Sequence, residues 1–263
     1  MLISSRANPR VKQLRAAFAG HARLAAGLVA IEGEHLLFEA MRSGLVFKTI
    51  FVSERRGVPD WTPANVELIE LTDEVFASVV DTQSPQGLAA LLVPPVWTID
   101  DALPVRSAAP LLLIAAGLQD PGNLGTLVRS AEAFGAAAVL TTAGTVSEWN
   151  QKALRASAGS VFRVPVVQVA AGELASLKSR GVRILAAVAP GAEGDAASID
   201  AHVADLTGGC ALMVGNEGAG LSAELLAIAD GRINIPTPGR VESLNAAVAG
   251  SLLLYEASRQ RTR

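Results

Sequence analysis

The sequence predicts an α/β protein, and three observations support that fold class. Short apolar segments alternate with segments of helical periodicity along most of the chain. The segment Leu111–Ala116 is apolar without alternation, which is typical of a strand covered on both faces. Gly44, Gly135 and Gly181 directly follow helical segments, where glycine ends helices. This alternation predicts parallel or mixed sheets flanked by helices.

Residues 1–93 predict the smaller of two such units. Asn8-Pro9 opens a turn, and Pro9 suits the first position of a helix that extends to about Ala19. His35–Arg42 predicts the next helix, because a glycine follows it as a stop signal. The other expected elements are a strand from Val29 that turns at Gly33-Glu34, strands at 47–52, 66–71 and 86–93, and a short helix at 73–79.

A linker is expected at 94–109. Pro94, Pro95, Pro104 and Pro110 cluster in and beside this stretch, and proline removes a backbone donor and breaks helices. We therefore expect a first domain at 1–93 and a second at 110–263.

The second unit predicts a longer alternation of strands and helices. Asn123 is expected to cap its first helix, Ser222 a later helix and Ser243 the last one. Strands are expected at 111–116, 137–142, 164–169, 183–188, 210–214 and 233–235, and helices at 124–134, 150–158, 173–179, 222–228 and 244–259.

Composition excludes several classes of protein. With 22 basic and 25 acidic residues, the net charge of −3 excludes histone-like wrapping of nucleic acid but allows a local basic patch. The single cysteine, Cys210, excludes an intrachain disulfide and a cysteine-rich zinc site. Apolar stretches fall short of the roughly 18 residues of a membrane helix. We expect a soluble, cytoplasmic protein with no membrane contact, and the three scattered histidines indicate no metal site.

The first 31 residues carry five cations and no acidic residue, a pattern shared with transit peptides. The run from Ile3 to Val11 nevertheless indicates a structured start. Arg6, Asn8, Lys12 and Arg15 belong either to a solvated helix face or to a surface that contacts phosphates. The residues alone leave both interpretations open.

Three segments of the second unit follow predicted strands, where ligands bind in α/β sheets. The first contains Asn123, Gly125 and Arg129. Its glycine allows close approach of a backbone or ligand, and Arg129, six residues beyond Asn123, lies within two helical turns, from which it could point back toward the loop. Taken alone, the residues favour Asn123 as a plain helix cap and Arg129 as a surface ion-pair residue.

The second segment runs from a strand through Gly215, Glu217, Gly218 and Gly220 into a helix. Such a loop can present backbone N–H groups to a nucleotide-like ligand, although many glycine-rich turns are only turns. The glycine spacing differs from the dinucleotide-binding fingerprint, which disfavours a nicotinamide-dependent oxidoreductase.

The third segment leaves a short strand at Ile235 and reaches the last helix through a Pro-Thr-Pro-Gly loop. Ser243 there is typical of an N-cap. Asn245 is harder to explain as a residue inside a helix, because asparagine competes for backbone hydrogen bonds.

Together the segments resemble the SpoU (TrmH-like) family of RNA ribose 2′-O-methyltransferases, of the SPOUT class. Order and spacing agree, and the first domain is similar, more weakly, to the family's ribosomal-protein-like RNA-binding domain. The sequence departs from the family at Thr237-Pro238, in the cofactor loop. The matching residues are Asn123, Gly125, Arg129, Gly215, Glu217, Gly218, Gly220, Ile235, Pro236, Gly239, Ser243, Leu244, Asn245 and Ala249.

The resemblance implies a trefoil-knotted C-terminal domain, a homodimer with its site at the subunit interface, and S-adenosylmethionine as cofactor without a metal. It implies that Arg129 acts catalytically, with Asn123, Glu217, Ser243 and Asn245 orienting it and the substrate. The implied cofactor contacts are Gly215, Gly220, Ile235, Gly239 and Leu244.

The implied substrate is RNA, with ribosomal RNA favoured. Transfer RNA and a catalytically silent RNA-binding protein of the same fold are the alternatives. The resemblance favours Arg6, Asn8, Lys12 and Arg15 as RNA contacts. Since the chain has one tyrosine, three tryptophans and seven phenylalanines, we expect shape and phosphate contacts to dominate over base stacking.

Overall fold

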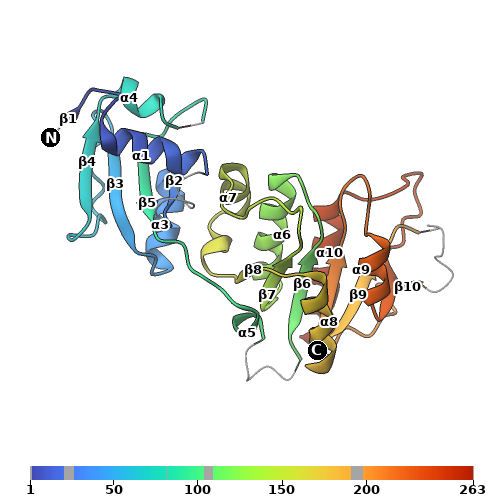
Figure 1. The fold of residues 1–263 in the computed structure, drawn as a ribbon. Helices are drawn as coiled ribbons and strands as arrows, with labels where there is room; N and C mark the ends of the chain where they lie inside the picture. The colour runs from blue at the N-terminus through green and yellow to red at the C-terminus, as the bar shows by residue number, and fades with distance from the viewer. Residues whose placement is uncertain (1, 21–26, 81, 104–108, 191–197, 263) are drawn as a thin grey trace. The chain divides into compact units, whose positions relative to one another are not determined.

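A computed structural model describes residues 2–20, 27–80, 82–103, 109–190 and 198–262 (Figure 1). The chain divides into two compact units. Unit 1 comprises Met1–Val96 together with Trp149–Phe162, and unit 2 comprises Trp97–Glu148 together with Arg163–Arg263. Both are α/β, as the sequence predicts.

Unit 1 is built on a mixed five-stranded sheet in the order β1-β4-β3-β5-β2. Strand β5 runs antiparallel to β2 and β3, whereas β1, β4 and β3 pair in parallel. The strands are β1 (Leu2–Ile3), β2 (Val29–Glu32), β3 (Phe47–Ser53), β4 (Glu67–Leu71) and β5 (Leu88–Leu92).

Helices of unit 1 bury apolar stripes against this sheet. Helix α1 (Pro9–Phe18) starts with Pro9 after the Asn8 cap, as expected, and buries Val11, Leu14 and Ala17. Helices α3 (Glu34–Arg42) and α4 (Asp73–Ala77) follow β2 and β4. Helix α7 (Gln151–Ser157) and the 3-10 turn η1 (Ser160–Phe162) come from later in the chain but belong to this unit by contact.

A hydrogen bond holds this later segment against unit 1. The Gln151 side chain donates to the Ala30 carbonyl at 2.8 Å, and the Trp149 and Phe162 rings stack with centroids 6.2 Å apart. A Cβ at Gly159 would lie 2.7 Å from Glu39 Cβ, so only glycine fits the contact.

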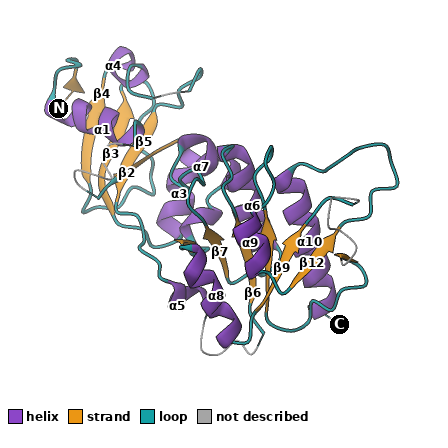
Figure 2. Ribbon diagram, turned by 45° about the vertical axis from the view of Figure 1, so that its right-hand side comes forward, coloured by secondary structure: helices purple, strands orange, loops and turns teal. Residues whose placement is uncertain are grey.

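Unit 2 contains a seven-stranded parallel sheet in the order β10-β12-β9-β11-β6-β7-β8 (Figure 2). Its central strands are fully buried, which explains their apolar runs without alternation. The strands are β6 (Leu111–Ala115), β7 (Ala138–Thr141), β8 (Val166–Gln168), β9 (Arg183–Ala187), β10 (Ser198–Asp200), β11 (Cys210–Val214) and β12 (Gly231–Asn234).

Helices cover both faces of this sheet. Helices α8 (Ala171–Ser179) and α9 (Ala223–Ile228) share one apolar cluster with Leu112, Ile114 and Met213. Helices α6 (Pro121–Ala133) and α10 (Ala246–Arg261) pack together, and a Cβ at Gly250 would lie 2.5 Å from Leu127 Cδ2. The absent side chain therefore lets α10 approach α6 closely.

The structure corrects two expected helix caps. Asp120, not Asn123, caps α6, because Pro121 occupies the first helical position and the Asp120 carboxylate accepts from Gly122 and Asn123 N–H groups. Asn245, not Ser243, caps α10 and accepts from the N–H groups of Ala247 and Val248.

Four short elements were not anticipated, one of which is the 3-10 turn η1. Strands β1 and β10 have two and three residues, too few for a periodicity signal. The expected linker contains α5 (Ile99–Ala102), where the Thr98 N–H and hydroxyl both donate to Asp101. That Thr-x-x-Asp spacing resembles a capping box, so the start of this helix could have been predicted from the sequence.

Candidate functional site

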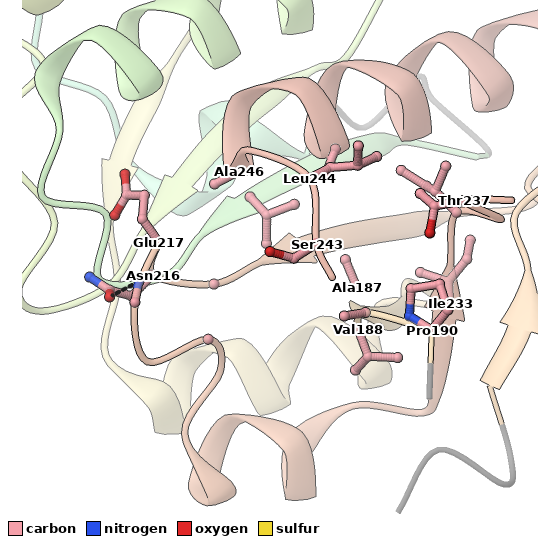
Figure 3. A pocket seen from close by; sticks show the side chains of 17 residues that line it. Ala187, Val188, Pro190, Asn216, Glu217, Ile233, Thr237, Ser243, Leu244 and Ala246 are labelled. Atoms are coloured by element: carbon pink, nitrogen blue, oxygen red, sulfur yellow. Dashed lines mark hydrogen bonds between the residues drawn. The ribbon is translucent and has the colours of Figure 1, made fainter. Parts of the chain in front are cut away.

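A cavity of about 250 Å³ lies at the carboxyl ends of β9, β11 and β12 in unit 2 (Figure 3). Four stretches of the chain line it: residues 187–190, 214–220, 233–237 and 243–249. The last three overlap the second and third sequence segments. Figure 3 shows Glu217 and Asn216 at one end and Pro190 and Thr237 at the other, with Ser243 on the loop before α10.

The loop after β11 is a tight backbone hairpin. Asn216 and Gly220 exchange two backbone hydrogen bonds of 3.0 Å. A Cβ at Gly215 would lie 2.4 Å from the Gly220 carbonyl carbon, and Gly220 has φ +67°. Both positions therefore require glycine, which gives the glycine pattern a concrete cause.

Asn216 supports this loop from within, and the sequence analysis did not single it out. Its carbonyl oxygen accepts from the N–H groups of Gly218 and Ala219, and its amide donates to the Gly117 carbonyl at 2.8 Å. The Gly117 N–H in turn donates to the hydroxyls of Thr142 and Thr145. An asparagine beside glycines commonly closes such turns, so the sequence could have indicated this role of Asn216.

Asn123, Glu217 and Asn245, one from each sequence segment, form a hydrogen-bonded chain. The Asn123 amide donates to Glu217 Oε1 at 2.7 Å, and its carbonyl oxygen accepts from Asn245 Nδ2 at 3.1 Å. Because Asn245 also caps α10, the orientation of every group in the chain is fixed.

Glu217 is held ionised. Partial burial raises the pKa of its carboxyl, but hydrogen bonds from the Asn123 side chain and from backbone N–H groups outweigh it, so the pKa lies below the ordinary value. The carboxylate is thus an acceptor only at neutral pH.

The expected site residues divide between the cavity wall and its surroundings. Glu217 and Ser243 line the cavity. Asn123 is linked to it by its hydrogen bond to Glu217, and Asn245 by its hydrogen bond to Asn123. Gly239 is exposed and does not line it. The expected cofactor contacts that do line it are Gly215, Gly220, Ile235 and Leu244.

Arg129 lies outside this cluster. It is exposed in α6 and makes no hydrogen bond or ion pair with another described residue. Six residues of helix place it about 9 Å along the axis from Asn123 and about 120° around it. Within one chain, therefore, no hydrogen bond or ion pair between described residues joins Arg129 to the loop.

The expected RNA contacts lie at the start of unit 1. Asn8 accepts from the Arg10 N–H as the cap of α1, and Lys12 is exposed on that helix. The Arg6 guanidinium pairs with Glu74 at 2.8 Å, and Arg15 is half-buried. The structure thus places these side chains on and before one helix.

The cavity lining suits a ligand that has apolar parts and one positively charged centre. Glu217 is the only charged side chain among the described residues that line it. Val188, Ile233, Ile235 and Leu244 supply apolar surface, and the loop backbone supplies hydrogen-bonding groups. This composition fits a heterocycle with a positively charged centre better than a polyphosphate.

Two family models match the sequence. The SpoU rRNA Methylase family matches residues 110–255, and an MRM3-like substrate binding domain matches residues 8–90. Within the described part of the chain, no helix has the length and apolar character needed to cross a membrane.

Similar proteins span nearly the whole chain. The 23S rRNA (guanosine(2553)-2′-O)-methyltransferase RlmP of Bacillus subtilis is 36% identical over 256 residues, covering 96% of this chain and 97% of that protein. The human mitochondrial rRNA methyltransferase 3 is 30% identical over 285 residues, covering 89% of this chain and 68% of that protein. The crystal structure of the SpoU methyltransferase AviRb from Streptomyces viridochromogenes, in complex with AdoMet, superposes with TM-score 0.85 and 27% identity, covering 97% and 98% of the two chains.

Proposed function

The chain belongs to the SpoU rRNA methylase family, and from that premise we propose that it methylates a ribose 2′-hydroxyl of ribosomal RNA. It is an RNA methyltransferase that uses S-adenosylmethionine. The observation that carries the assignment is the hydrogen-bonded chain of Asn123, Glu217 and Asn245 beside the cavity, which unites the three family motifs.

The cavity residues fit this cofactor. S-adenosylmethionine supplies a methyl group activated on a sulfonium centre. A lining with a single carboxylate and no lysine or arginine among its described residues suits that cation. We assign Gly215, Gly220, Ile235 and Leu244 to hold the cofactor, and Gly239 to shape the loop that encloses it.

We assign Arg129 to stabilise negative charge on the ribose oxygen and the neighbouring phosphate. A guanidinium remains protonated in proteins, so an electrostatic role is physically easier than proton abstraction. Asn123, Glu217, Ser243 and Asn245 position the substrate, and alignment of the reacting atoms is the main contribution of such a site.

We further propose a homodimer in which Arg129 of one subunit serves the cavity of the other. Two observations support it. Arg129 is exposed on α6 and has no hydrogen bond or ion pair with its own Asn123 cluster among the described residues. On α10, Val248, Leu252 and Tyr255 are 48%, 44% and 52% exposed, and their spacing places them on one helix face. Such an apolar stripe is suited to burial against a second copy.

Three finer features of the architecture belong to the same proposal. The segment 236–245, between β12 and α10, forms part of a trefoil knot. The domains are a substrate-binding domain at 1–93, a linker at 94–109 and a methyltransferase domain at 110–263. The first domain has a ribosomal-protein-like fold and contacts RNA through Arg6, Asn8, Lys12 and Arg15; the match of residues 8–90 to a substrate binding domain supports this role.

We propose a cytoplasmic location, with the mitochondrion as the alternative, because both bacterial and mitochondrial relatives occur. Calorimetry tests the function: S-adenosylmethionine binds and NAD does not. Methylation of purified ribosomal RNA, with transfer RNA in parallel, separates the two RNA substrates. Cofactor binding without methylation of either RNA would instead indicate a silent RNA-binding protein.

A further inference from the structure

At the outer face of α3 in unit 1, the exposed Phe38 pairs with the partly buried Trp61 of a nearby loop. Phe38 is 37% exposed, and its ring meets Trp61 edge-on with centroids 6.1 Å apart. The Arg42 guanidinium lies 5.9 Å from the centre of the same Phe38 ring. Exposed aromatic rings beside arginine are the surfaces on which proteins stack unpaired nucleobases.

A cavity of about 370 Å³ opens beside the first turn of the same helix. Arg56 and Gln86 line it, together with the apolar side chains of Phe76 and Pro85. Both polar residues are anchored to Glu34 at the start of α3, since Arg56 pairs with its carboxylate at 2.6 Å and Gln86 Oε1 accepts from its N–H. The cavity is therefore linked to the first turn of the helix that carries Phe38 four residues later.

The charge of this cavity favours a base over a phosphate. Arg56 is neutralised by Glu34, and Arg55, which also lines the cavity, pairs with Asp73 at 2.7 Å. The guanidinium groups thus offer hydrogen-bond donors without a net positive charge. The Gln86 amide nitrogen has no partner among the described residues, so it adds a further donor. Such a site suits a neutral, polar, planar ring.

We propose that the outer face of α3, with Trp61 and the cavity at Arg56 and Gln86, is a binding site for unpaired nucleobases of the RNA substrate. One base stacks on the Phe38–Trp61 pair, and a neighbouring base enters the cavity. The inference rests on the proposed function. It also adds base stacking to the phosphate and shape contacts expected from the sequence, because Phe38 and Trp61 bring two aromatic rings together at this face.

The test uses the full-length protein and a fluorescent dodecamer of mixed sequence, as single strand and as duplex. Trp61→Ala and Phe38→Ala weaken single-strand binding roughly 5- to 150-fold, the range for loss of one stacked base. Trp61→Phe keeps an aromatic face and restores most of the affinity. Leu68→Ala, which alters an exposed apolar residue of β4 outside this face, binds like the unmodified protein.

Salt dependence separates stacking from charge. Trp61→Ala leaves the slope of log affinity against log salt unchanged, whereas Lys12→Gln flattens it by about 0.7 if Lys12 contacts a phosphate. Equal losses for single strand and duplex, or full affinity in both alanine variants, would overturn the proposal.

Ultraviolet cross-linking provides a readout that does not depend on the variants. In the unmodified protein, cross-linked peptides from α3 and from the loop containing Trp61 support the site, and their absence contradicts it. Methylation of ribosomal RNA is measured in parallel. Its absence would contradict the proposed function, whereas dodecamer binding decides the base site separately.

Discussion

The side chain of Asn123 donates a hydrogen bond to Glu217, with Nδ2 and Oε1 2.7 Å apart, although 94 residues separate them in the chain. Asn123 lies in the first turn of α6, and Glu217 lies in the loop after β11. The same amide accepts from Asn245 at the start of α10. Asn123 is the central member, because its loss removes both of these side-chain hydrogen bonds.

Asn123→Ala is expected to lower kcat roughly 5- to 150-fold, because it removes the side-chain hydrogen bonds to Glu217 and from Asn245 that position both groups, at a cost of about 1–3 kcal/mol. Methyl transfer at saturating RNA measures kcat, and calorimetry measures the cofactor Kd, which should change little. Thr126→Ala, on the exposed side of the same helix, is the control. Equal kcat for both variants would show that the hydrogen-bonded chain has no role in positioning.

Gly215→Ala is expected to weaken cofactor binding roughly 5- to 150-fold, because the new Cβ would lie 2.4 Å from backbone atoms of Gly220 that cannot move cheaply. Such overpacking costs about 1–3 kcal/mol. Gly239→Ala meets no atom within 4 Å and should bind the cofactor within about twofold of the original. Calorimetric titration with S-adenosylmethionine compares the Kd values of the two variants. A larger loss of affinity for Gly239→Ala than for Gly215→Ala would contradict the assigned position of the cofactor.

Mixed dimers test whether Arg129 serves the partner's cavity. With the cofactor kept well below the weakened Kd of Gly215→Ala, homodimers of Arg129→Ala and of Gly215→Ala should both be nearly inactive. After unfolding and refolding together, activity should return to about a quarter of the original, because half the dimers are mixed and each has one complete site. No recovery, in a preparation that sedimentation shows to be dimeric, contradicts the shared site.

Glu256 should make stability depend on acid pH. Hydrogen bonds from Arg259 are the main cause that lowers the pKa of this carboxyl from 4.5 to about 2, against a smaller opposing effect of burial. Its contribution is therefore present above pH 4.5 and is lost as the pH falls toward 2. Because Arg259 is 37% exposed, the contribution is at most about 1 kcal/mol.

Urea unfolding of the original protein and Glu256→Gln measures this contribution. The difference in free energy of unfolding should be constant near neutral pH and should shrink as the solution is acidified. If this difference in free energy of unfolding grew on acidification, the carboxylate of Glu256 would not stabilise the folded protein as predicted.

The sequence predicted most of the elements because their causes are local. Apolar runs gave the strands of both sheets, and Ser222 caps α9 as expected. The caps of α6 and α10 were wrong because neighbouring residues compete for them: Asp120 precedes a proline, and Asn245 is also held by Asn123. Competition of this kind is decided by tertiary contacts.

The candidate site was predictable in its residues but not in its geometry. Glycine spacing pointed to the loop of Gly215 and Gly220, whose close backbone contact explains it. Nothing local indicates that Asn216 reaches Gly117, or that 149–162 packs with unit 1. The aromatic pair of Phe38 and Trp61 was also hidden, because the two residues meet only after folding.

The most direct test of the central claim is the chemical identity of the product. Purified protein is incubated with unmodified ribosomal RNA and S-adenosylmethionine, and the RNA is digested to nucleosides and analysed by mass spectrometry. We predict one 2′-O-methylated nucleoside, which is absent from the reaction with Arg129→Ala. Methylation on a base, or none in the presence of bound cofactor, would contradict the account.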